Sequence, residues 1–223
     1  MKIVALFATV VVAALPQSAY AQSPQPATEP AAAPAAAQPC AACHGARGEG
    51  IPAAGFPRIA AQSQYYIARQ LRSYADGSRR NPVMEGFAKT LSAADRASVG
   101  TYYAQLDAPA AASGDVAPPE RGRVLAIQGS AERRVQACIN CHGPGGSGEP
   151  PAYPYLAGLD AKYIAAALQA WKDGTRTNDT GQQMLGIARA LTPEDVAAVA
   201  DYFASLPPPK PSPLDIVQAP AAR

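Results

Sequence analysis

The sequence predicts an all-α protein that consists of two tandem copies of one helical unit. Three observations lead to this prediction. A five-residue cysteine and histidine pattern occurs twice, the similarity between the two halves continues well beyond that pattern, and the apolar residues of each half recur at helical spacing. Repetition at this scale together with a helical period predicts two units of the same architecture.

The repeated pattern is C-x-x-C-H, and its two copies contain all four cysteines and both histidines of the chain: Cys40, Cys43 and His44, then Cys138, Cys141 and His142. This pattern is the signature of covalent c-type haem attachment. The two thiols add to the haem vinyl groups, and the adjacent imidazole becomes the proximal ligand of the iron. We therefore expect two covalently bound haem c groups, each containing one iron.

Other uses of these residues explain the pattern less well. A zinc site with two Cys and two His needs a second His three to five residues further on, and neither copy has one. A four-cysteine zinc site that spans both halves leaves both adjacent histidines unexplained. A thioredoxin-like redox pair would lie beside a βαβ pattern, which this sequence lacks.

The N-terminal residues predict export. Residues 1–21 read as a signal peptide, because an apolar run of 13 residues, 3–15, precedes an A-x-A cleavage site at residues 19–21. That run is shorter than the roughly 20 residues that span a bilayer, and no later segment is apolar enough. We expect a periplasmic protein with no membrane span after cleavage. Residues 22–38 are rich in Ala and Pro and predict a flexible segment.

The repeat sets the domain boundaries. We expect a first unit at 39–107, a linker at 108–118, a second unit at 119–208 and a Pro-rich tail at 209–223. Without the signal peptide the chain has 18 Lys and Arg against 17 Asp and Glu, a formal charge of +1, and four haem propionates would bring it to −3. A chain with this charge does not predict a nucleic-acid partner.

Each unit predicts two main helices. The first follows Ser63 or Asp160 as N-cap, and a glycine (Gly77 or Gly174) ends it. The second begins at a capping box, which is Ser92 with Asp95 in the first unit and Thr192 with Asp195 in the second.

One helix has no counterpart in the other unit. Residues 120–128 predict a helix ahead of Cys138, whereas only Ala and Pro-rich sequence precedes Cys40. We therefore expect the first haem to be the more exposed one.

Two methionines are the candidates for the sixth iron ligand. Met84 and Met184 are the only methionines outside the signal peptide, and they lie 40 residues after His44 and 42 after His142. Both histidines are already used, so bis-histidine ligation by this chain is impossible. Methionine also fills cores, but that interpretation requires two matched positions by chance. A thioether favours ferrous iron, so such haems have high potentials.

Four flanking residues are candidates for supporting roles. A ligating histidine usually donates its second ring proton to a carbonyl or carboxylate, and the carbonyls of Pro57 and Pro154 occur at matched positions. Rigid turns are the alternative use of these prolines. Asn81 and Asn178 precede the methionines, where they would lie near the sulfur or cap a turn.

Residues 39–208 resemble the di-haem cytochrome c4 family. The resemblance rests on the two C-x-x-C-H-G motifs, on the segments around Pro57 and Pro154, and on the run D-G-[ST]-R-x-N at residues 76–81 and 173–178. It implies two fused class I cytochrome c-like helical domains, each around one covalent haem. It also implies two His/Met haems whose edges approach each other across a pseudo-two-fold interface.

These observations predict an electron carrier and no catalytic residue. The expected donor is a respiratory complex or dehydrogenase, and the expected acceptor is a terminal oxidase or reductase. The alternative is a cytochrome subunit that stays bound to a dehydrogenase or oxidase as its electron port. A di-haem peroxidase or a thiosulfate-oxidising enzyme is disfavoured, because catalytic haem needs an open iron site and the chain has no spare His or Cys.

Overall fold

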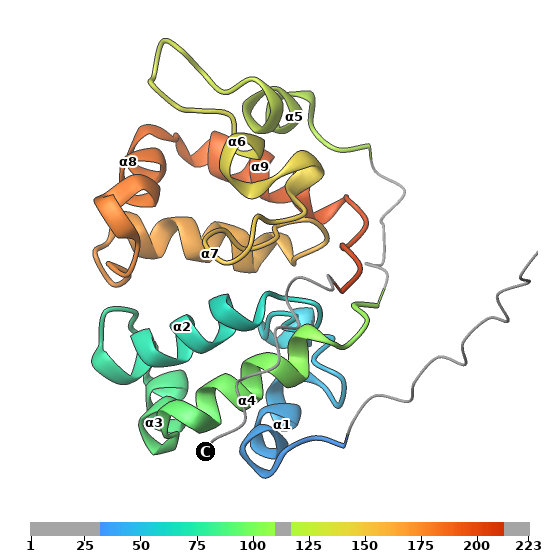
Figure 1. Ribbon diagram of the computed structural model, residues 1–223. Helices are drawn as coiled ribbons and strands as arrows, with labels where there is room; N and C mark the ends of the chain where they lie inside the picture. The colour runs from blue at the N-terminus through green and yellow to red at the C-terminus, as the bar shows by residue number, and fades with distance from the viewer. Residues whose placement is uncertain (1–31, 110–116, 212–223) are drawn as a thin grey trace, which may run out of the picture.

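The computed structural model describes residues 32–109 and 117–211. The signal peptide, most of the segment 22–38, part of the linker and the end of the tail lie outside the described residues. Within them the chain forms α-helices and short 3-10 helices and no strands, which confirms the all-α prediction. The two units lie one above the other, with α2 of the first facing α7 of the second (Figure 1).

The first unit consists of two 3-10 helices and four α-helices: η1 (Ala35–Cys40), α1 (Ala41–His44), η2 (Pro52–Ala54), α2 (Gln64–Asp76), α3 (Pro82–Thr90) and α4 (Ala93–Ala104). The second unit begins with α5 in place of η1 and has one further 3-10 helix, η4, but otherwise repeats this order: α5 (Glu120–Ile127), α6 (Ile139–His142), η3 (Pro144–Gly146), α7 (Ala161–Lys172), η4 (Thr180–Gln182), α8 (Gln183–Ala190) and α9 (Pro193–Ala204). Helices α6 to α9 thus match α1 to α4.

The helix ends follow the sequence signals with one exception. Both capping boxes form at α4 and α9, and Asp160 caps α7. Gly77 ends α2 in the left-handed conformation, with φ of 81°. Ser63 occupies the N-cap position of α2, but its side chain makes no capping hydrogen bond. Its hydroxyl is instead buried without a partner, so the expected cap is absent.

Each unit has its own apolar core. In the first, α2 packs on α4 around Tyr103 and Val99. A side chain at Gly100 would meet the backbone oxygen of Gln64 at 2.5 Å, so this crossing requires a glycine. In the second, α9 packs on α7 and on the additional helix α5.

The two units differ at their N-terminal ends. The first unit begins with η1, which starts four residues ahead of the expected boundary at residue 39 and buries Ala37 in the core. The second begins with α5, where the sequence predicts a helix at residues 120–128, and continues into the loop 129–137. Asp195 holds this region in place: its carboxylate is fully buried and accepts hydrogen bonds from Arg121, at 2.7 Å, and from Arg133.

No helix among the described residues is long and apolar enough to cross a membrane.

Candidate haem-binding sites

A continuous cavity runs through both units and contains both sets of predicted site residues. Its volume is about 1220 Å³, above the roughly 300–1,000 Å³ of an ordinary small-molecule site. Cysteines, histidine and methionine of both units lie on its walls, together with the residues of the interface between the units. The cavity therefore joins the two predicted haem sites.

The first site is built around a buried histidine. The Nδ1 atom of His44 lies 2.7 Å from the carbonyl oxygen of Pro57, at hydrogen-bond distance. Burial lowers the pKa of His44, although this hydrogen bond opposes the shift. The imidazole is therefore neutral at pH 7, and a proton on Nδ1 leaves Nε2 as a free metal ligand.

The second site repeats this arrangement. The Nδ1 atom of His142 lies 2.8 Å from the carbonyl oxygen of Pro154, and burial again lowers the pKa of this histidine. The Nε2 atom of His142 is buried and has no hydrogen-bond partner among the described residues. A buried polar nitrogen without a partner is unfavourable, and a metal ion at Nε2 would remove this cost.

The two methionines lie at the start of matched helices. Met84 belongs to the first turn of α3, where Asn81 caps the helix by accepting a hydrogen bond from the Met84 amide at 3.0 Å. Met184 belongs to the first turn of α8, where Asp179 accepts hydrogen bonds from the amides of Met184 and Leu185. Both methionines are partly buried and line the cavity.

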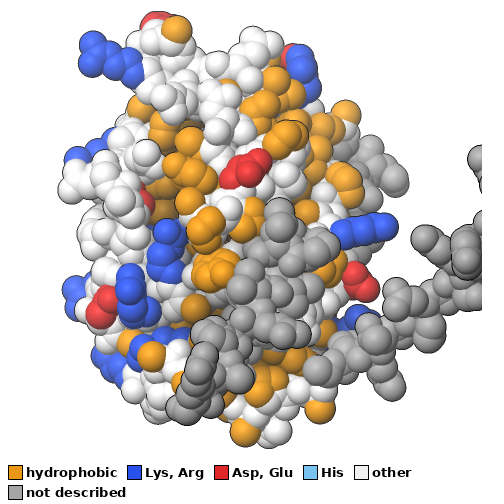
Figure 2. All heavy atoms as spheres, in the orientation of Figure 1, with side chains coloured by type: hydrophobic (Ala, Val, Ile, Leu, Met, Phe, Trp, Pro, Cys, Tyr) orange, Lys and Arg blue, Asp and Glu red, His pale blue; other side chains and the backbone are white. Residues whose placement is uncertain are grey.

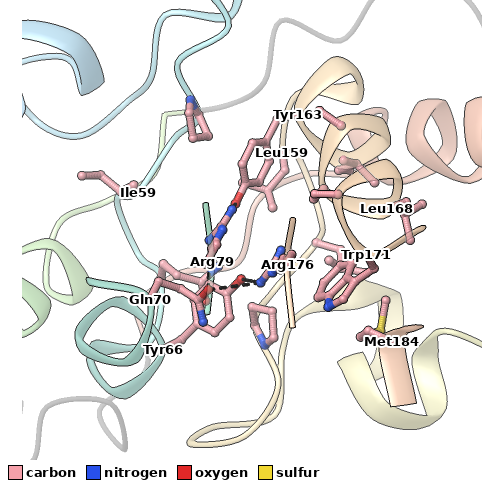
Figure 3. Close-up of a pocket in the computed structure, with 18 of the residues that line it drawn as sticks. Ile59, Tyr66, Gln70, Arg79, Leu159, Tyr163, Leu168, Trp171, Arg176 and Met184 are labelled. Atoms are coloured by element: carbon pink, nitrogen blue, oxygen red, sulfur yellow. Dashed lines mark hydrogen bonds between the residues drawn. The ribbon is translucent and has the colours of Figure 1, made fainter. Parts of the chain in front are cut away.

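Asp179 is not among the site residues predicted from the sequence. Its carboxylate also accepts a hydrogen bond from the Trp171 indole at 3.1 Å, so it ties α7 to the start of α8. In Figure 3, Trp171 and Met184 lie on the same side of the pocket. Asp179 directly follows Asn178, which is aligned with Asn81. The second unit has three more residues than the first between this asparagine and the methionine, and this insertion is the sequence feature that could have indicated a different helix start there.

The cysteines lie on the helical turns that end in the histidines. None of the four forms a disulfide, and all are partly buried. Burial raises the pKa of Cys138 to about 11 and that of Cys40 above its ordinary value. Both thiols are therefore protonated at neutral pH in this apolar environment.

Two arginines cross the interface in a reciprocal pattern. Arg79 of the first unit donates to the hydroxyl of Tyr163 in the second at 3.1 Å, and Arg176 donates to the hydroxyl of Tyr66 in the first at 2.9 Å. Each guanidinium also stacks on an aromatic ring of its own unit, Arg176 at 3.8 Å from the Trp171 ring centre. The backbones of Arg79 and Arg176 pair directly as an isolated antiparallel bridge.

The two guanidiniums converge on one amide. The Oε1 atom of Gln70 accepts hydrogen bonds from Arg79, at 3.0 Å, from Arg176, at 3.2 Å, and from Asn178, at 2.9 Å. In Figure 3, Gln70 lies beside Arg79 and Tyr66, with Arg176 to its right. The matched position in the second unit is Ala167, so only one unit supplies this acceptor. Asn178 therefore serves the interface, whereas Asn81 caps a helix.

The interface concentrates buried positive charge. Arg79, Arg176 and Arg58 all line the cavity, and each is at least nine-tenths buried. Within the described ranges none of them forms an ion pair, and two nitrogens of Arg58 have no hydrogen-bond partner. Buried charges are costly without a counter-charge. The cavity thus offers apolar walls, two neutral imidazoles and cations that suit carboxylates, which fits two haems with their propionates.

Comparison with known proteins agrees with this chemistry. The family model "Cytochrome c" matches residues 127–207. The thiosulfate dehydrogenase electron acceptor of Thiomonas intermedia is 46% identical over 174 residues, which cover 75% of this chain and 78% of that protein. Cytochrome c4 of Pseudomonas aeruginosa is 36% identical over 172 residues, which cover 75% of this chain and 83% of that protein.

Solved structures show the same relationship. Reduced recombinant cytochrome c4 from Pseudomonas stutzeri matches with a TM-score of 0.68 at 31% identity, over 75% of this chain and 93% of that chain. Thiosulfate dehydrogenase (TsdBA) from Marichromatium purpuratum matches with a TM-score of 0.71 at 39% identity, over 75% of this chain but only 36% of that longer chain. The chain therefore belongs to the di-haem cytochrome c4 family of electron-transfer proteins, which bind haem c covalently.

Proposed function

We propose that this chain is a periplasmic electron carrier that accepts electrons from a dehydrogenase and delivers them to a terminal oxidase or reductase. The observation that supports it best is the continuity of the cavity, because both predicted iron sites open into one space that crosses the interface. An electron that enters one unit then has a short path to the other.

In this proposal the chain's own residues would hold each iron. His44 and Met84 would be the ligands in the first unit, and His142 and Met184 would be those in the second. The bound haems supply reversible one-electron chemistry at the iron. Pro57 and Pro154 fix the orientation of the imidazoles through their carbonyls, and the helix caps at Asn81 and Asp179 fix the starts of α3 and α8.

The proposed donor is a thiosulfate dehydrogenase. The support is that the Thiomonas intermedia relative carries the name of an electron acceptor for such an enzyme. Two thiosulfate ions that join through a new S–S bond release two electrons, and two one-electron sites on one chain accept both. The chain itself has no catalytic role in this scheme.

An anaerobic mixing experiment tests this assignment. The ferric protein is mixed with thiosulfate and a purified thiosulfate dehydrogenase, and haem reduction is followed by absorbance. We expect full reduction at two electrons per chain, and no reduction when the dehydrogenase is omitted. A chain that dithionite reduces but the enzyme and thiosulfate leave ferric would contradict the proposed donor.

A second candidate is a permanent subunit of the dehydrogenase. The observation that favours it is the Marichromatium purpuratum structure, in which a unit similar to this chain is about a third of a longer polypeptide. Native mass spectrometry of the protein purified from its own cells separates the two candidates. A free carrier gives the mass of one chain with two haems, whereas a subunit gives the mass of a complex.

A further inference from the structure

The mouth of the cavity in the first unit is apolar and open to solvent. Val83 and Phe87 line the cavity, and their side chains remain 57% and 48% exposed. They lie four residues apart on α3, so they are neighbours on one face of the helix, on either side of Met84 in sequence. Pro39 and Ala54 are also exposed and line the same cavity. We call these four residues the α3 rim.

The opening of the cavity in the second unit is lined by different residues. The residue matched to Val83 is Gln183, and the one matched to Phe87 is Ile187, which is less exposed. The loop 129–137 adds two arginines, Arg133 and Arg134, to the cavity wall there. The apolar, exposed mouth is thus a feature of the first unit.

The loop at the second mouth is fixed in place. The buried carboxylate of Asp195 binds Arg133 of this loop and Arg121 of α5. Among the described residues the first unit has only η1 in the corresponding place, and the matched Asp95 bonds to its own capping-box partner, Ser92. Access to the second mouth is therefore restricted by a bonded segment that has no counterpart in the described part of the first unit.

The net charge also differs between the two units, and the first unit is the more positive one. Residues 39–107 contain 8 Lys and Arg against 5 Asp and Glu, whereas residues 119–208 contain 8 against 9. The first unit is thus +3 and the second −1 before the propionates are counted. At the α3 rim, Arg80 is exposed beside the cavity, and Lys89 is exposed on α3. Figure 2 shows Lys and Arg side chains along the left edge of the molecule, over both units, and others at the right edge.

We propose that the α3 rim is the docking surface for the redox partner, so that electrons enter and leave the chain through the first haem site. The partner it fits is a redox protein with an apolar contact patch and carboxylates at its margin. An apolar centre with a charged margin is the usual anatomy of a protein interface, and opposite charges mainly accelerate association. This inference rests on the proposed electron-carrier function and adds the face and the entry site.

The test compares matched double variants in the two units. Val83→Ser with Phe87→Ser removes apolar contact at the α3 rim, and Gln183→Ser with Ile187→Ser makes the equivalent change in the second unit. Each ferric holoprotein is mixed with thiosulfate-reduced thiosulfate dehydrogenase in stopped flow. We expect the second-order rate constant to fall at least tenfold for the first variant and less than twofold for the second.

Two further measurements separate docking from damage to the haem site. The reduction potentials and the rate of reduction by dithionite are measured for each double variant, because Val83, Phe87, Gln183 and Ile187 also line the cavity. A fall in the rate constant that a changed potential or a slower dithionite reaction accounts for would contradict the docking assignment. Arg80→Glu should lower the rate constant at low salt and weaken its dependence on ionic strength, because steering by surface charge is screened by salt.

Several results would overturn the docking assignment. One is an equal effect of the two double variants, and another is a larger effect in the second unit. A wild-type dimer in sedimentation that becomes a monomer in the Val83 and Phe87 variant would show that the α3 rim joins two copies instead.

A wild-type protein that the dehydrogenase does not reduce would contradict the proposed donor alone. The same variants, tested as electron donors to a purified cytochrome c oxidase, then decide the docking face by the same tenfold criterion. Exchange with neither partner would contradict both proposals.

Discussion

Arg176 of the second unit donates a hydrogen bond to the hydroxyl of Tyr66 in the first unit at 2.9 Å, and Arg79 makes the reciprocal contact with Tyr163. Burial raises the pKa of Tyr163, but the two arginines lower it by more, so this pKa lies below its ordinary value. The two units are therefore joined by charge-assisted hydrogen bonds between residues that line the cavity.

The acceptor shared by these arginines predicts a stability effect. Gln70→Leu leaves the donors on Arg79, Arg176 and Asn178 without their common partner, and each buried polar group without a partner costs about 1–3 kcal/mol. We expect the holoprotein to lose about 2–3 kcal/mol of unfolding free energy in chemical denaturation, because haem propionates would compensate part of the charge. Gln169→Leu, at an exposed position on α7, is the matched control and should change stability by less than about 0.5 kcal/mol. Equal effects would show that Gln70 does not join the units.

The methionines predict a spectroscopic change. Met84→Ala and Met184→Ala should each weaken the sulfur-to-iron charge-transfer absorption of the ferric protein by about half and lower the potential of one haem, because a soft thioether favours ferrous iron. Absorbance spectra and potentiometric titrations check this. An unchanged spectrum in either variant would make that methionine a core residue.

Asp195 predicts an acid-dependent difference between the units. Burial raises its pKa, but the hydrogen bonds from the Thr192 backbone, Arg121 and Arg133 lower it by more, to about 2. The pKa is thus depressed on folding. The stabilisation is fully present above the unfolded value of about 3.9 and is lost as the pH falls through about 2.

The matching experiment is chemical denaturation of the wild type and Asp195→Asn between pH 7 and pH 2. We expect a difference of about 2 kcal/mol at neutral pH, because Arg121 and Arg133 remain partly in solvent. The difference should shrink below about pH 4. Asp95→Asn in the first unit should show a smaller effect. A difference that does not change with pH would contradict the role of the carboxylate.

Much of the fold was predictable because its signals are local. The haem motifs, the capping boxes at Ser92 and Thr192 and the additional helix before Cys138 each depend on residues close together in sequence. The hydrogen bond of Arg133 to Asp195 joins residues 62 apart, and that of Arg176 to Tyr66 joins residues 110 apart. Such partners are set by how helices pack, so neither the Asp195 contacts nor the role of Gln70 followed from the pattern. A local signal can also fail: Ser63 is a typical N-cap residue and occupies the N-cap position of α2, but its side chain makes no capping hydrogen bond.

The unequal N-terminal ends predict unequal haems. The first unit has η1 where the second has α5 and a bonded loop. Water at a haem edge favours the more charged state of the site, which is ferric iron for neutral ligands. The more basic first unit opposes this effect, but surface charge is screened within about 8–10 Å at physiological salt. We expect the lower potential at the first haem, and potentiometric titration of the two methionine variants assigns the steps. A higher potential at the first haem would contradict this order.

We propose that one chain holds two His/Met haems that each take one electron. Coulometric reduction of the ferric protein, followed by absorbance, measures the number of electrons per chain and the loss of the sulfur-to-iron absorption. We expect two electrons per chain, with that absorption disappearing in two one-electron steps. Uptake of one electron per chain, or two electrons without that absorption in the ferric state, would contradict it.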